Sequence, residues 1–220
     1  MKFEFKEIDV EDFIWRSIPD GTLSKRGLDL PRGVFYRQVQ LGGCGVLDIV
    51  GIQIGKEIYE EREGQTIDCS FVRITVYELK RHELTCNDFG QISRYIDCLE
   101  LNTPVLRGTY KIPDHYDIQV RGVLIGSGID PDAFHLMMMM QGGNIDVMRF
   151  TISIEAGIMF ENILKSKGFE IREINSLPAI SMRSLFRGSF PLKADFVPKK
   201  RKEPFGDSAT DKHLPAEISI

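Results

Sequence analysis

The sequence predicts an α/β fold in which a central mixed β-sheet is flanked by α-helices. Segments that alternate apolar and polar residues, as strands do, are separated by segments whose apolar residues recur every three to four positions, as in helices. Three strands are followed by a helix, a strand, a helix and a strand, an order typical of a mixed sheet with helices on its faces. The chain has 220 residues, 42% of them hydrophobic, so it can bury a core without disulfide bonds.

The first half of the chain begins with a short amphipathic helix at residues 7–18. Val10, Phe13 and Ile14 follow helical spacing in this segment, and Pro19 stops it. After a loop rich in Gly, Pro and Asp, three alternating segments predict a consecutive antiparallel meander. Its strands are expected at 34–41, 46–54 and 71–80, joined by a glycine-rich turn at 42–45 and a charged turn region at 55–65.

The second half alternates helices with strands. A helix at 87–101 carries an apolar stripe that includes Phe89, Ile92 and Ile96, and Pro104 is expected to end it. Residues 155–175 fit either a helix or a hairpin. The remaining expected elements are a strand at 118–125, a helix at 130–141 and a strand at 145–154.

The composition excludes several classes of protein. The N-terminus has no apolar signal-peptide core, and no run reaches the roughly 18 apolar residues of a membrane span. The four cysteines contain no C-x-x-C pair, which fits neither a zinc ribbon nor a disulfide framework and suggests a reducing compartment. We therefore expect a soluble cytoplasmic protein that does not bind membranes.

Basic residues gather near the C-terminus although the whole chain has a net charge of −4. Residues 178–205 contain seven Lys or Arg and two Asp or Glu, so this stretch is basic and the rest of the chain acidic. We expect one domain at 1–195 and a flexible tail at 196–220. The tail includes the basic run Lys199, Lys200, Arg201 and Lys202, which is compatible with a polyanionic partner but equally with a solvated tail.

Three charged residues near strand ends are candidates for chemistry. Glu78 and Lys80 point to the same face of their strand, whereas Asp48 interrupts an apolar run and needs a partner or a metal if it is buried. If the two strands are neighbours, both carboxylates and the lysine converge on a hard oxygen site suited to Mg²⁺. Gln91 and Tyr95 share one face of the next helix, from which Gln91 can reach the same site. The alternative for Glu78 and Lys80 is an exposed ion pair.

These residues together resemble the PD-(D/E)xK nuclease superfamily. The order is Asp48 within Gly45–Gly51, then Glu78-Leu79-Lys80, then Gln91-x-x-x-Tyr95, then Val120–Ile125. The resemblance covers roughly residues 7–155. It is nearest to the branch with a Q-x-x-x-Y motif, which includes RecB-type nucleases and archaeal-type mismatch endonucleases. It implies a restriction-endonuclease-like core and metal-dependent hydrolysis of DNA, with RNA not excluded.

The resemblance also implies roles for single residues. Asp48, Glu78 and the Leu79 carbonyl would hold Mg²⁺ or Mn²⁺, with Glu11 as a further ligand and Glu7 as its alternative. Lys80 would orient water or neutralise charge at phosphorus, and Gln91 would hold Lys80 or a metal-bound water in place. Tyr95 either contacts phosphate or packs the helix on the sheet. The expected nucleic-acid contacts are Tyr95, Arg94 and the basic run at 199–202.

Other interpretations of the sequence remain open. One is a catalytically inactive nucleic-acid-binding or assembly module that keeps the nuclease fold. Another is a protein–protein interaction module whose acidic residues lie on the surface. The methionine run at 137–140 fits either core filling or a contact between two copies in a homodimer.

Overall fold

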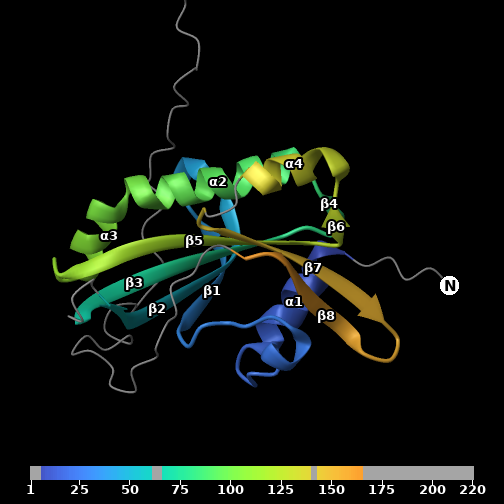
Figure 1. Ribbon diagram of the computed structural model, residues 1–220, viewed down its shortest axis with the longest axis horizontal. Helices are drawn as coiled ribbons and strands as arrows, with labels where there is room; N and C mark the ends of the chain where they lie inside the picture. The colour runs from blue at the N-terminus through green and yellow to red at the C-terminus, as the bar shows by residue number, and fades with distance from the viewer. Residues whose placement is uncertain (1–5, 61–65, 140–142, 166–220) are drawn as a thin grey trace, which may run out of the picture.

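The computed structural model describes residues 6–60, 66–139 and 143–165. A six-stranded sheet in the order β1-β2-β3-β5-β7-β8 forms its centre, with helices on both faces (Figure 1). The strands are β1 (Val34–Gln40), β2 (Val46–Glu60), β3 (Thr66–Leu79), β5 (Tyr116–Gly126), β7 (Ile145–Ser153) and β8 (Gly157–Leu164). The helices are α1 (Glu7–Ser17), α2 (Cys86–Leu101), α3 (Thr103–Tyr110) and α4 (Pro131–Met139). Short elements are β4 (Glu83–Leu84), β6 (Gly128–Ile129) and the 3₁₀ turns η1 (Ser24–Arg26) and η2 (Gly42–Cys44).

Strand pairing makes the sheet mixed. β1, β2 and β3 form the predicted antiparallel meander, whereas β5 lies parallel to both β3 and β7, and β8 returns antiparallel to β7. The predicted fold class, a central mixed sheet flanked by helices, is confirmed.

Two hydrophobic cores hold the layers together. On one face, α2, α3 and α4 cover the sheet (Figure 1). Phe89 and Ile92 of α2 belong to the same buried cluster as Val76 of β3. On the opposite face, Val10 and Ile14 of α1 pack against a second cluster that includes Tyr77. Helix α2 lies so close to β5 that a Cβ at Gly122 would come within 2.7 Å of the Ile92 side chain. This contact places α2, the helix that carries Gln91 and Tyr95, directly over β5, the strand next to β3.

Most predicted elements are present, but three segments differ from the prediction. The sequence predicts a turn region at 55–65. This prediction is wrong for residues 55–60, because β2 continues to Glu60. Pro104 does not simply end α2: it occupies the first turn of the separate helix α3, where its missing N–H costs nothing. The segment at 155–175, which by sequence fits a helix or a hairpin, forms a hairpin as far as it is described: β8 begins at Gly157, which has φ +70°, and pairs with β7, while residues 166–175 lie outside the described residues. The predicted tail at 196–220 lies outside the described residues.

The helices settle two smaller points. Among the described residues, no helix is long and apolar enough to cross a membrane. In the methionine run, Met137 is buried in the core, whereas Met139 is 84% exposed, and Met140 lies outside the described residues. Of the described methionines in this run, Met137 therefore fills the core. A homodimer contact through the others stays a prediction.

The interpretation of the cysteines is wrong for one pair, because Cys44 and Cys98 form a disulfide bond. Cys44 ends the turn η2 and Cys98 lies on α2, and their 54-residue separation conceals this proximity in the sequence. Both residues are buried between helix and sheet. Cys69 and Cys86 remain as free thiols.

Removal of this disulfide should destabilise the domain. We expect the double variant Cys44→Ala/Cys98→Ala to lose about 4 kcal/mol of unfolding free energy, because a crosslink over 54 residues restricts the unfolded chain. Urea unfolding of the variant measures the loss, and wild type under reductant should show a similar one. The control is Cys69→Ala/Cys86→Ala, which removes two free thiols and keeps the bond. A wild type whose stability does not respond to reductant would contradict the expectation.

Candidate active site

Asp48 and Glu78 lie side by side where β2 and β3 separate. The last backbone pair between these strands is Ile49 with Tyr77, so Asp48 and Glu78 are the next residues outward. Facing residues of an antiparallel pair share one side of the sheet. Asp48 also contacts β3 directly, because its Oδ2 accepts a hydrogen bond from the Leu79 N–H at 2.9 Å. The predicted adjacency of the two strands is therefore confirmed.

Lys80 completes this group of charges. Its Nζ donates to Glu78 Oε1 at 2.7 Å and lies 4.0 Å from Glu7 Oε1 on the first turn of α1. The side chains of Lys80 and Glu78 are only 11% and 2% exposed, so the pair is not a solvated surface ion pair. The Lys80 N–H continues β3 by donating to the Ile125 carbonyl of β5. The sheet therefore fixes the backbone that presents the lysine.

Burial and crowding shift the protonation of the two acids. Desolvation is the main cause that raises the pKa of Asp48 to about 6, and the Leu79 hydrogen bond and the Lys80 charge oppose it. Desolvation, together with the charge of Asp48, raises the pKa of Glu78 to about 7. Burial by itself would lower the pKa of Lys80, but the hydrogen bond from Lys80 to Glu78 and the surrounding carboxylates raise it. Lys80 is thus a cation, while each acid gains from a further positive charge.

The oxygen atoms of this site fit a hard divalent cation. Glu78 Oε1 is engaged by Lys80, whereas Oε2 is buried and has no hydrogen-bond partner among the described residues. An orphaned carboxylate oxygen beside a second carboxylate is an arrangement that a cation stabilises. Within the described ranges, no three His, Cys, Asp or Glu side chains cluster closely enough to hold a metal. The ligands of an ion here would accordingly be Asp48, Glu78, the Leu79 carbonyl and water.

The structure places Glu11 in a different network. Its side chain is buried, and both carboxylate oxygens accept hydrogen bonds from Gln38 Nε2 at 2.9 Å. Oε1 also accepts one from Arg37 Nε at 2.5 Å, and Arg37 further pairs with Asp12. Gln38 has a positive φ of +51° and interrupts β1 beside Asp48, which turns its side chain toward α1. Sequence reasoning missed Arg37 and Gln38, and a metal-ligand role for Glu11 stays a prediction.

Of the Q-x-x-x-Y residues, Tyr95 contacts the strand that carries Asp48, and Gln91 contacts Tyr95. Gln91 Nε2 donates to the Tyr95 hydroxyl at 2.8 Å, and this hydroxyl donates to the Val46 carbonyl at 2.9 Å. Among the described residues, Gln91 makes no hydrogen bond to Lys80, one of the two partners that the resemblance implies; the other, a metal-bound water, stays a prediction. Tyr95 is 2% exposed, and its ring packs between helix and sheet. The packing alternative for Tyr95 is therefore the one that the structure shows.

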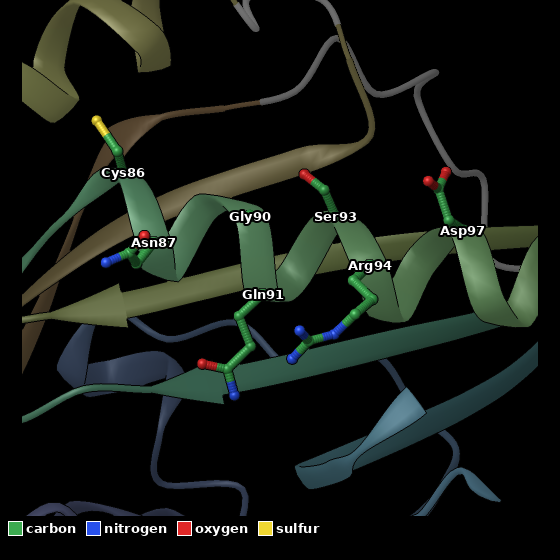
Figure 2. A pocket seen from close by; sticks show the side chains of 7 residues that line it. All are labelled: Cys86, Asn87, Gly90, Gln91, Ser93, Arg94 and Asp97. Carbon is green, nitrogen blue, oxygen red and sulfur yellow. The ribbon is translucent and has the colours of Figure 1, made fainter. Parts of the chain in front are cut away.

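A groove of about 670 Å³ follows the outer side of α2. Figure 2 shows Gln91 and Arg94 pointing from the helix toward the same side, and the Arg94 guanidinium lies 5.6 Å from the centre of the Tyr95 ring. The groove is lined by Cys86, Asn87, Gly90, Gln91, Ser93, Arg94 and Asp97. Arg94 is exposed and remains a predicted nucleic-acid contact. The other predicted contacts, Lys199, Lys200, Arg201 and Lys202, lie outside the described residues.

Comparison with known proteins gives little further information. No family model and no curated protein matches the chain. Among solved structures, the crystal structure of a repair endonuclease from Pyrococcus abyssi is similar, with a TM-score of 0.37 and 18% sequence identity. The likeness covers 67% of this chain and 47% of that one, so the chain spans about half the length of that endonuclease. At this level, the likeness assigns neither an activity nor site residues.

Proposed function

We propose that this chain is a metal-dependent nuclease that hydrolyses phosphodiester bonds of DNA. The observation that supports it most is the environment of Glu78, which is buried beside Asp48 with one oxygen on Lys80 and the other without a partner among the described residues. Two buried carboxylates share one lysine here, so ionising both of them costs free energy unless a further cation binds. The spacing of these residues in the sequence, which resembles PD-(D/E)xK nucleases, supports the same conclusion.

Each residue of the site then has a distinct task. Asp48, Glu78 and the Leu79 carbonyl would hold Mg²⁺ or Mn²⁺, which when bound acidifies water and offsets charge on the phosphate. Glu78 also holds Lys80 at 2.7 Å, which limits the movement of the ammonium group. Lys80 remains protonated and so presents a fixed positive charge where negative charge develops on the phosphate oxygens during hydrolysis. Burial of the pair excludes the water that would weaken this charge.

DNA is the proposed substrate because the motif order resembles DNA nucleases. Arg94 on the outer side of α2 and the basic run at 199–202 would supply contacts to the phosphate backbone. Such contacts are independent of sequence, so binding should weaken steeply with salt. RNA is a second polyanion that the same contacts would accept.

The test is cleavage of labelled single- and double-stranded DNA and RNA with Mg²⁺, with Mn²⁺ and with EDTA. We expect wild type to cut DNA only with a divalent ion, and Glu78→Gln to cut at background rate. Asp114→Asn is the matched control, because Asp114 is a fully exposed carboxylate far along the chain from the site. DNA binding without cleavage under every condition would identify the inactive module instead. If the protein neither binds nor cuts any of these nucleic acids, that result would contradict a nucleic-acid function altogether.

A further inference from the structure

The first residues of β2 extend beyond the end of β3. Backbone pairing of β2 with β3 begins at Ile49, whereas its pairing with the edge strand β1 reaches back to Val46. Val46 and Leu47 therefore pair with β1 only, and the register pairs Asp48 with neither neighbouring strand. Successive carbonyls of a strand point to opposite sides, and a buried carbonyl without a donor is costly. Asp48 belongs to this segment, so the group that replaces the missing strand also affects its position.

Tyr95 supplies the missing donor. Its hydroxyl donates to the Val46 carbonyl at 2.9 Å and accepts from Gln91 Nε2 at 2.8 Å. On the other strand, the Asp48 carboxylate takes the place of a backbone carbonyl, because it accepts the hydrogen bond from the N–H of Leu79, the last residue of β3. Where β2 and β3 separate, the side chains of Tyr95 and Asp48 thus replace the backbone hydrogen bonds that a longer strand pair would make.

Two neighbouring contacts hold the same segment against α2. Gly45 has φ +129°, and a Cβ there would lie 2.8 Å from the Tyr95 ring, so the backbone crosses directly over the ring. Cys44 is bonded to Cys98, which lies about one helical turn beyond Tyr95. The three consecutive residues 44–46 are therefore fixed to α2 by a covalent bond, a packed ring and a hydrogen bond.

We propose that Tyr95 is a positioning residue for Asp48 that acts through the Val46 carbonyl and the backbone of β2. The inference rests on the proposed function of the carboxylate site, and it assigns Tyr95 to the placement of a metal ligand rather than to contact with phosphate. Gln91 orients the Tyr95 hydroxyl by donating to it, which leaves the hydroxyl proton for Val46. Gln91 and Tyr95 then form a hydrogen-bonded connection from α2 to the start of β2.

The test compares Tyr95→Phe with wild type in two measurements. Phenylalanine keeps the ring over Gly45 and leaves the disulfide intact, so only the hydrogen bonds are lost. The first measurement is amide hydrogen exchange at Leu79, whose N–H is bonded to Asp48, with Val76 in the same strand as the internal reference. The second is the dissociation constant for Mn²⁺ in wild type and in the Asp48→Asn background. Tyr116→Phe is the matched control, because Tyr116 lies in the same core opposite Ser70, well down β3 from the site.

We expect Leu79 exchange to rise roughly fivefold to tenfold in Tyr95→Phe, the factor typical of one buried hydrogen bond. Val76 exchange should be unchanged, and Tyr116→Phe should leave both amides as in wild type. Mn²⁺ affinity should fall by a similar factor, but not further once Asp48 is already replaced. Unchanged Leu79 exchange in Tyr95→Phe would overturn the inference. If wild type binds no Mn²⁺ and cuts no DNA, the proposed nuclease has failed, and Leu79 exchange decides the positioning role by itself.

Discussion

Replacement of Lys80 by methionine should lower kcat for DNA cleavage by roughly 10²–10³-fold, the effect of removing one preorganised charge from a transition state. The expected cause is electrostatic rather than structural. Methionine preserves most of the apolar stem of a side chain that is 11% exposed, so the fold should remain intact. The ammonium group that offsets developing charge at phosphorus is lost. Single-turnover cleavage with saturating Mn²⁺ measures the effect on the chemical step.

The same replacement of Lys80 should leave the affinity for Mn²⁺ unchanged or increase it. Lys80 competes with a cation for Glu78, because its Nζ engages Glu78 Oε1 at 2.7 Å. Without Lys80, both carboxylate oxygens are available and the local negative charge is larger. Mn²⁺ titration by calorimetry should therefore show an affinity equal to or tighter than that of wild type. Arg149→Met is a suitable control, since Arg149 forms a partly exposed ion pair with Glu161 on the outer strands. Normal cleavage by Lys80→Met would exclude the lysine from the site.

The adjacency of Asp48 and Glu78 could be predicted from the sequence because it follows from local patterns. Alternation sets the face of each residue, and consecutive alternating segments pair as a meander. The burial of Lys80 could not be predicted in this way. It depends on α1 and β5, which approach the site from elsewhere in the chain, and E-x-K by itself fits an exposed pair equally well.

The contacts of Gln91 and Cys98 show a second limit. Helical spacing places Gln91 and Tyr95 on one face, but it does not state which strand this face contacts. The structure places Tyr95 on the start of β2, with Gln91 bonded to its hydroxyl, and the same placement of the helix brings Cys98 to Cys44. Glu11 shows the converse case. Its position on the first helix matches what the sequence resemblance implies, but Gln38 adopts a left-handed conformation that no sequence pattern indicates, and its amide binds the carboxylate.

Replacement of Asp48 by asparagine should stabilise the metal-free protein at pH 8 while abolishing cleavage. The folded state retains the protons of Asp48 and Glu78 up to about pH 6 and 7, whereas ordinary carboxyl groups release theirs near pH 4. The folded state thus binds more protons than the unfolded state between these values, and the free energy of unfolding falls as the pH rises through this window. Asparagine removes one of the two charges, and its amide oxygen still accepts the Leu79 N–H.

The advantage of the variant should therefore grow from about pH 4, below which the carboxyl group is protonated in both states, and be complete above about pH 7. We expect it to reach roughly 1–3 kcal/mol at pH 8 in EDTA, from the size of the pKa shifts. Urea unfolding of both proteins at pH 5, 6.5 and 8 measures this difference, with Asp114→Asn as the exposed-carboxylate control. Mn²⁺ should reverse the order at pH 8, because it stabilises only the protein that binds it. If Asp48→Asn is less stable than wild type at pH 8 in EDTA, the buried charge of Asp48 is not unfavourable in the metal-free protein and the site does not depend on a cation.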